Sequence, residues 1–176
     1  MQCGDFDKPL GDTDQATPRF SLIHLISLTM QAGLGPCTLS SLLDRFGTAQ
    51  SVLAASTSEL LSVHGVGKKN VQQIRAASDL GQAAEVLRWC KRQKTNILPR
   101  VSESYPHWLG ELPQAPTLLY VQGNVLPEDR LSVAVVGTRH ATTYGITQAS
   151  RFSFGLAKAG ITVVSGLARG IDAAAH

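Results

Sequence analysis

Apolar residues recur at steps of three and four along the first part of the chain, which is the spacing of one face of an α-helix. In the first such segment the apolar positions are Phe20, Ile23, Ile26 and Met30. Gly33, Gly35 and Pro36 interrupt the pattern, and Pro36 suits the first turn of a second helix because its missing N–H is not needed there. The spacing predicts that this second helix ends at Gly47, a good left-handed cap, and that a short helix around Val52 follows.

Further helices are predicted by their start signals. Ser56 and Glu59 have the spacing of a capping box, in which each residue bonds the other's backbone N–H. The segment 65–67, Gly-Val-Gly, predicts a tight turn, and Lys68 opens the helix that follows it. A last helix is predicted from Asp79 to about Arg92.

The pattern changes over residues 97–130, which hold five of the eight prolines and short apolar runs. This composition predicts a linker with one or two β-strands. Residues 132–137 then form a continuous apolar run, which is typical of a strand buried on both faces of a parallel sheet. A helix capped by Thr142 or Thr143 follows, and 161–165 repeat the strand pattern, so the order predicts a Rossmann-like βαβ unit.

The predicted fold class is a helical SAM-like domain of tandem helix-hairpin-helix units, followed by an incomplete Rossmann-like parallel α/β domain. We assign residues 1–17 to a disordered leader, 18–95 to the helical domain, 96–130 to a linker with lead-in strands, and 131–176 to the α/β domain. Two parallel strands and one helix do not cover both faces of an open sheet. We therefore expect the chain to be part of a longer protein.

Composition places the chain among folded proteins, because 43% of its residues are hydrophobic and 16% are charged. The net charge is only +3, yet eight of the sixteen basic residues lie between Lys68 and Arg100. A local basic face can bind phosphates, although a solvated helix surface explains the same cluster equally well.

Nothing in the sequence indicates secretion or a membrane span. Cys3, Cys37 and Cys90 have no metal-binding or redox spacing, which is typical of reduced cytosolic thiols. The amino terminus is acidic and lacks the apolar core of a signal peptide, and the apolar run 20–30 is too short to span a bilayer. The sequence predicts a cytoplasmic protein that has no membrane partner.

The first candidate site is the glycine turn that precedes Lys68 and Lys69. Glycines at 65 and 67 let the backbone turn tightly, so the first amides of the next helix and the two lysines could bind a phosphate without reading a base. Gly33-Leu34-Gly35-Pro36 is a degenerate first copy of the motif without lysines. Such units also serve purely as packing modules, and that alternative stays open.

The second candidate site follows the first buried strand and contains Gly137, Thr138 and Arg139. The Gly-x-Gly-x-x-Gly fingerprint is absent and Arg139 stands where a pyrophosphate would need bare backbone, so NAD and FAD are disfavoured. A helix start with threonine hydroxyls and one arginine suits a phosphate group. Ordinary helix capping with a surface arginine is the alternative.

The third candidate site follows the second strand and contains Gly166, Arg169 and Gly170. Loops at the carboxyl ends of adjacent parallel strands share one crevice, so its arginine is expected to converge with that of the preceding loop. Asp172 is most simply a helix cap or an arginine partner, and a lone His176 makes no catalytic case. We see no metal cluster, cofactor motif or catalytic triad, and predict a protein that is not an enzyme.

These residues resemble the signature of the DprA/Smf family of DNA-processing proteins. The resemblance is carried by 135–139, by Tyr144-Gly145 and, most specifically, by 163–176, Val-Val-Ser-Gly-Leu-Ala-Arg-Gly-Ile-Asp-Ala-Ala-Ala-His. Upstream, Gly33-Leu34-Gly35-Pro36, 45–47 and 119–124 are similar to the family's helical domain and its lead into the fold. Thr138 stands where the family usually has serine, so the hydroxyl is kept.

The resemblance implies sequence-independent binding of single-stranded DNA and delivery of that strand to the RecA recombinase during natural transformation or recombination. It implies that Arg139 and Arg169 contact the DNA, and that a homodimer forms through later parts of the α/β domain. The alternatives are a Rossmann-like enzyme acting on a nucleotide or another phosphate ligand, and an interaction module whose helical domain packs on a partner.

Overall fold

The structure is a computed structural model that describes residues 22–176. The chain divides into a first unit that ends at Gln122 and a second unit, Gly123–His176, and each is described by itself. The predicted leader and Phe20 lie outside the described residues. Every helix within the described range is too short or too polar to cross a membrane.

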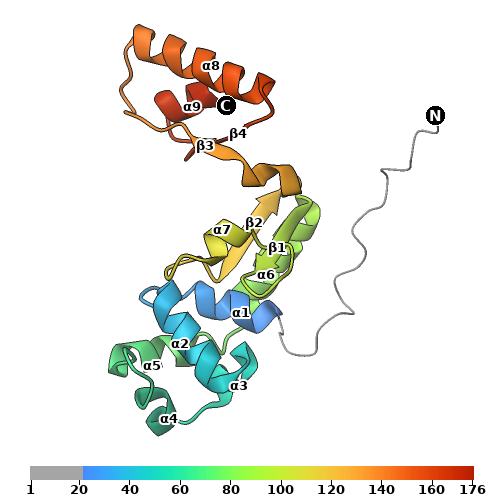
Figure 1. Cartoon of the computed structure of the whole chain (residues 1–176). Coiled ribbons are helices and arrows are strands. Elements are labelled where there is room, and N and C mark those ends of the chain that lie inside the picture. The colour runs from blue at the N-terminus through green and yellow to red at the C-terminus, as the bar shows by residue number, and fades with distance from the viewer. Residues whose placement is uncertain (1–21) are drawn as a thin grey trace, which may run out of the picture. The chain divides into compact units, whose positions relative to one another are not determined.

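The first unit consists of seven described helices and one strand pair, labelled in Figure 1. They are α1 (Leu22–Thr29), α2 (Pro36–Phe46), α3 (Ala49–Ala54), α4 (Thr57–Leu61), α5 (Lys68–Ala76), α6 (Gly81–Arg92), β1 (Thr95–Pro99), α7 (His107–Gly110) and β2 (Leu118–Gln122).

Local signals set the ends of these helices as the sequence predicts. α2 begins at Pro36 and closes on Gly47, which has φ +78° and donates its N–H to the Leu43 carbonyl oxygen at 2.7 Å. The capping box of α4 is present in both directions, since the Ser56 N–H donates to Glu59 Oε2 and the Glu59 N–H donates to Ser56 Oγ. Each such cap contributes about 1 kcal/mol to its helix.

The apolar face predicted for the first helix is only partly right. Ile26 is fully buried, but Met30 is 41% exposed, while Leu28 and Ser27 are buried on other sides of α1. α1 contacts both α3 and α6, so more than one face of this helix is buried. The Ser27 hydroxyl is satisfied because it donates to the Ala77 carbonyl oxygen at 2.6 Å, at the end of α5.

The core of the first unit joins the helices to the strand pair. Its fully buried side chains are Leu25, Ile26, Leu28, Leu42, Val52, Leu60 and Ile74. Each contributes roughly 1.5–3 kcal/mol relative to exposure. Leu118 of β2 belongs to the same cluster, and β1 pairs antiparallel with β2 from Thr95 opposite Gln122 to Pro99 opposite Leu118. The strands that were predicted within 96–130 as lead-in strands therefore belong, together with the helices, to the unit that ends at Gln122.

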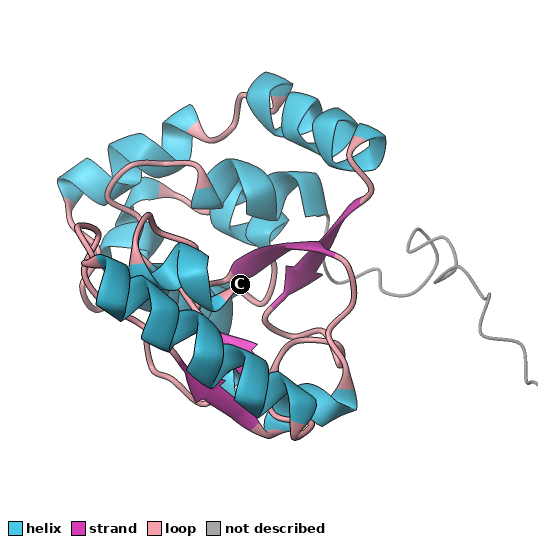
Figure 2. Ribbon diagram, turned by 90° about the horizontal axis from the view of Figure 1, so that it is seen from above, coloured by secondary structure: helices cyan, strands magenta, loops and turns pink. Residues whose placement is uncertain are grey.

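The second unit is a short βαβ arrangement. It contains a 3-10 helix (Pro127–Arg130), β3 (Ser132–Ala134), α8 (Thr143–Lys158), β4 (Thr162–Val164) and α9 (Ile171–Ala175). β3 pairs parallel with β4, with Val133 opposite Val163, and the two strands form a sheet of their own. The strands are drawn in magenta in Figure 2. The predicted parallel strand–helix–strand order is confirmed.

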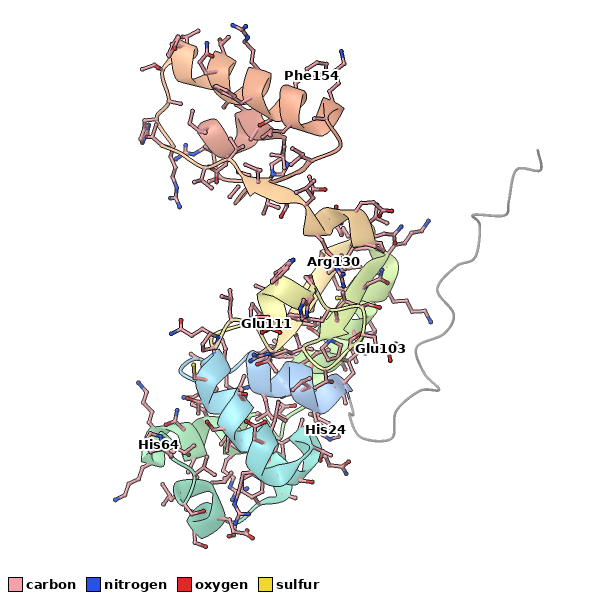
Figure 3. The ribbon with its side chains drawn as sticks, viewed as in Figure 1. His24, His64, Glu103, Glu111, Arg130 and Phe154 are labelled. Carbon is pink, nitrogen blue, oxygen red and sulfur yellow. The ribbon has the colours of Figure 1, made fainter. Side chains whose placement is uncertain are left out.

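The prediction that these strands are buried on both faces is wrong for the described residues. All of β3 is exposed, Val136 is 68% exposed and Val164 is 50% exposed. The physical reason is that a two-stranded sheet is too narrow to be enclosed, whatever the hydrophobicity of its residues. α8 likewise exposes Phe152 and Phe154. Phe154 is labelled in Figure 3.

Candidate nucleic-acid interface

The two candidate loops of the second unit leave the sheet at the same edge. Because β3 and β4 are parallel, the segments after Ala134 and Val164 emerge side by side. The Val135 N–H donates to the Val164 carbonyl oxygen at 3.0 Å, and Ser165 Oγ donates to the Val135 carbonyl oxygen at 2.7 Å. The hydroxyl of Ser165 therefore holds the two strand ends together.

The backbones of these loops touch at Gly170. Gly170 has φ +88°, and a Cβ there would overlap the Thr138 carbonyl oxygen and lie 2.9 Å from the Arg139 carbonyl carbon. The next amide, of Ile171, donates to the Thr138 oxygen at 3.2 Å. Only glycine permits this approach, because it lacks a Cβ and adopts positive φ without strain.

A second contact between the loops runs through Gly137 and Asp172. A Cβ on Gly137 would lie 2.6 Å from Cγ1 of Ile171, so this position is also limited to glycine. Its N–H donates to Asp172 Oδ1 at 3.2 Å, and Asp172 Oδ2 lies 2.9 Å from where a Cβ of Gly166 would be. The Asp172 side chain is buried, so its carboxylate positions both loops rather than pairing with an arginine.

Arg139 and Arg169 flank this contact. Arg169 precedes Gly170, and Arg139 belongs to the segment whose carbonyls face Gly170. Both arginines are exposed, and neither forms an ion pair with another residue of the described range. The predicted convergence of the two loops is therefore present in the backbone, and each loop carries an uncompensated cation.

The threonines of the first loop have structural roles. Thr138 Oγ1 accepts the His140 N–H at 3.1 Å, and Thr142 Oγ1 accepts the Gly145 N–H at 3.2 Å as the cap of α8. The amides of Thr143 and Tyr144 are the first two of α8 and have no partner within the helix. Such amides, at the positive end of a sixteen-residue helix, can donate to an anion.

The lysines of the helix-hairpin-helix motif belong to the first unit. Gly65 has φ +82° and forms the predicted turn, and Lys68 and Lys69 are exposed at the start of α5. The Gly67 N–H, however, donates to Asn70 Oδ1 at 2.9 Å, while Asn70 Nδ2 donates to the Gly33 carbonyl oxygen at 3.1 Å.

Asn70 thus joins the second hairpin to the degenerate first copy, and the Gly67 amide that it binds directly precedes the helix amides that the sequence assigned to a phosphate. Neither this role of Asn70 nor the positioning role of Asp172 was predicted from the sequence. A polar residue three positions after a cap glycine is a weak sequence signal for the role of Asn70. No local sequence signal exists for the role of Asp172.

Two family profiles match separate parts of the chain. The profile of the DNA recombination-mediator protein A family matches residues 96–176, and the SAM-like helix-hairpin-helix tandem profile matches residues 24–78. Protein Smf of Synechocystis sp. is 32% identical over 148 residues, which cover 82% of this chain and 37% of that protein. The chain belongs to the DprA/Smf family.

Two further DprA proteins extend the comparison. The DNA processing protein DprA of Bacillus subtilis is 34% identical over 92 residues, which are 52% of this chain and 31% of that protein. The X-ray structure of DprA from Streptococcus pneumoniae aligns with a TM-score of 0.52 over 88% of this chain and 52% of that chain, at 24% identity. The fold is therefore that of DprA, and this chain spans about a third of the length of the first curated DprA/Smf relatives that it matches.

Proposed function

We propose that this chain binds single-stranded DNA independently of base sequence, through the loops that follow β3 and β4. The observation that carries the proposal is the contact of Gly170 with the Thr138–Arg139 backbone, which brings two loops together, each with an exposed and unpaired arginine. Arginine side chains bind phosphates by two parallel hydrogen bonds, and contacts to phosphate do not distinguish bases.

Membership of the DprA/Smf family supports a role in DNA processing and RecA-dependent recombination, as in natural transformation. In that role the chain holds a strand for transfer to RecA. RecA contact and homodimer formation belong to this proposal through the resemblance, and cytoplasmic location follows from the same role.

The competing enzyme hypothesis has little support in the second unit. It needs a catalytic carboxylate or base other than Asp172 and His176, and Asp172 is 7% exposed and accepts the Gly137 amide. A buried carboxylate that already holds two loops is poorly placed to exchange protons with a substrate.

The proposal is tested by fluorescence anisotropy of labelled oligo-dT and of a matched duplex at several salt concentrations. We expect the natural chain to prefer the single strand. The variant Arg139→Ala/Arg169→Ala should bind roughly 10-fold more weakly or worse, and its log–log salt slope should fall by about 1.4, because each phosphate contact on a single strand contributes about 0.7.

The matched control is Arg151→Ala/Lys158→Ala, which removes two exposed cations from the body of α8. Equal losses in the two double variants would show that only net charge matters and would refute the site. Unchanged binding of the Arg139/Arg169 variant would refute it as well.

A further inference from the structure

Two side chains of the basic cluster between Lys68 and Arg100 form hydrogen bonds to backbone carbonyl groups. Arg75 donates to the carbonyl oxygens of Leu53 at 3.0 Å and Ala55 at 2.6 Å, where α3 ends. Arg100 donates to the carbonyl oxygens of Gly110 and Leu112 and so fixes the segment around α7. These two arginines are structural.

Four of the remaining cations gather at the carboxyl end of α6. They are Arg88, Lys91, Arg92 and Lys94, and all four are exposed. Arg88 forms an ion pair with Glu85, whose Oε1 lies 4.0 Å away, but both side chains are well exposed and such a contact contributes little in water. No other ion pair within residues 22–176 involves this group.

Helix stability explains only part of this cluster. Lys91 and Arg92 lie in the last turn of α6, where positive charge interacts favourably with the helix dipole. Arg88 and Arg92, by contrast, are one helical turn apart, and like charges at that spacing repel. The cluster therefore carries more charge than the helix end requires.

Lys94 occupies a strained position. Its φ is +52°, directly after the C-cap Gln93, where glycine is the preferred residue. A side chain in this left-handed conformation is unfavourable in a folded chain. Replacing Lys94 by glycine should thus preserve or improve folding while it removes one cation.

An exposed indole lies within the same cluster. Trp89 is 47% exposed although its neighbour Cys90 is 2% exposed, because successive side chains of an α-helix point about 100° apart. Trp89 and Arg92 are three residues apart and share one side of the helix. Burial raises the pKa of the Cys90 thiol, so the cysteine adds no negative charge beneath this surface.

We propose that Arg88, Trp89, Lys91, Arg92 and Lys94, here named the α6 face, form a second contact for single-stranded nucleic acid. The cations bind the phosphates and a base stacks on the exposed indole. Interleaved cations and an accessible aromatic ring are the combination that binds a single strand, since stacking needs an unpaired base. The choice of DNA as the strand rests on the proposed function, but the α6 face is separate from the loops after β3 and β4.

Intrinsic fluorescence gives a direct test, because Trp89 and Trp108 are the only tryptophans of the chain. Trp108 is 64% exposed, and its ring lies tilted at a centroid distance of 5.3 Å from that of His107. Trp108→Phe therefore leaves Trp89 as the single tryptophan fluorophore at little structural cost. We expect oligo-dT to quench Trp89 in this variant, and we expect the quenching to persist when Arg139→Ala and Arg169→Ala are added.

Lys94→Gly should then weaken the oligo-dT affinity measured by Trp89 quenching and lower the log–log salt slope of that affinity by about 0.7. Arg45→Ala, which removes an exposed cation from α2, should change neither quantity. When Trp89→Ala is added to the Arg139→Ala/Arg169→Ala variant, its affinity for oligo-dT should fall by about fivefold or more. A loss in Lys94→Gly cannot come from misfolding if its unfolding midpoint is unchanged or raised.

The alternative outcomes are distinct. Oligo-dT binding without quenching of Trp89 overturns the α6 face and leaves the proposed function intact. Quenching of Trp89 together with an oligo-dT anisotropy affinity that Arg139→Ala/Arg169→Ala does not weaken overturns the proposed loop site alone. Equal quenching by duplex, or by polyglutamate at the same ionic strength, overturns the single-strand assignment and indicates a surface for duplex or for an acidic protein.

Discussion

Gly170 is the residue whose replacement tests the candidate interface most directly. Its backbone has φ +88° and ψ −126°, a conformation that side-chain-bearing residues rarely adopt. In Gly170→Ala the new methyl group must also displace the Thr138 carbonyl oxygen and the Arg139 carbonyl, which are backbone atoms and cannot move by a rotamer change.

The cost follows from these two effects. The unfavourable conformation contributes about 1–3 kcal/mol. Forcing a methyl group into filled space contributes about 1–3 kcal/mol more. We therefore expect the second unit to lose about 2–6 kcal/mol, and the loops that carry Arg139 and Arg169 to separate.

Amide hydrogen exchange is the suitable assay. Both tryptophans lie in the first unit, so their fluorescence does not report on this change. The Ile171 amide, which donates to the Thr138 oxygen, and the Val135 amide, which donates to Val164, are the reporters. At the lower end of the range their protection should fall by about 30-fold, and oligo-dT binding at the loops should weaken in parallel.

Gly155→Ala is the matched control. Gly155 lies inside α8, and a Cβ there would meet no atom within 4 Å. The same glycine-to-alanine change should stabilise α8 by about 0.5–1 kcal/mol, because alanine is the better helix former. If Gly170→Ala retained both its exchange protection and its DNA binding, the close packing of the two loops would be refuted.

Three further predictions concern single side chains. Asp172→Asn keeps an acceptor for the Gly137 amide and removes a negative charge beside the loops, so oligo-dT should bind more tightly at low salt; weaker binding by a folded variant would contradict this. Arg75→Ala removes two charge-assisted hydrogen bonds to the end of α3, and the first unit should lose about 1–2 kcal/mol in urea unfolding followed by tryptophan fluorescence; an unchanged midpoint would exclude this role. Hydrogen bonds from Ser56 lower the pKa of Glu59 below its ordinary value, so the stabilisation by its carboxylate is present above the unfolded pKa and is lost as pH falls through the folded pKa. In the natural chain the urea unfolding midpoint should therefore decrease as the pH is lowered, and in Glu59→Gln this decrease should be smaller. Identical plots of midpoint against pH for the two proteins would show that the carboxylate does not stabilise α4.

Local signals determined much of this protein from sequence alone. Pro36 and Gly47 bound α2, Ser56 and Glu59 cap α4, and Thr142 caps α8. Each of these depends on residues within four positions of one another, so the chain specifies them before any long-range contact forms. The order of strand, helix and strand in the second unit followed for the same reason, from runs of apolar residues and the turns between them.

Burial was determined less well, because it depends on neighbours that periodicity does not identify. Val136 has the sequence context of an enclosed strand but is 68% exposed, since β3 has only β4 beside it in the described residues. Met30 fitted a helical face and is also exposed, while Ser27 is buried because the end of α5 supplies an acceptor for its hydroxyl.

The roles of the charged and polar residues were decided by the tertiary structure. The sequence supplied a basic cluster, but only folding divides it into Arg75, which binds carbonyls twenty or more residues away, and the exposed cations at the end of α6. Asp172 and the Gly137 amide are 35 residues apart, and Asn70 reaches Gly33 over 37. A hydrogen bond across such a distance leaves no periodic trace, because its partner is selected by packing and not by position along the chain.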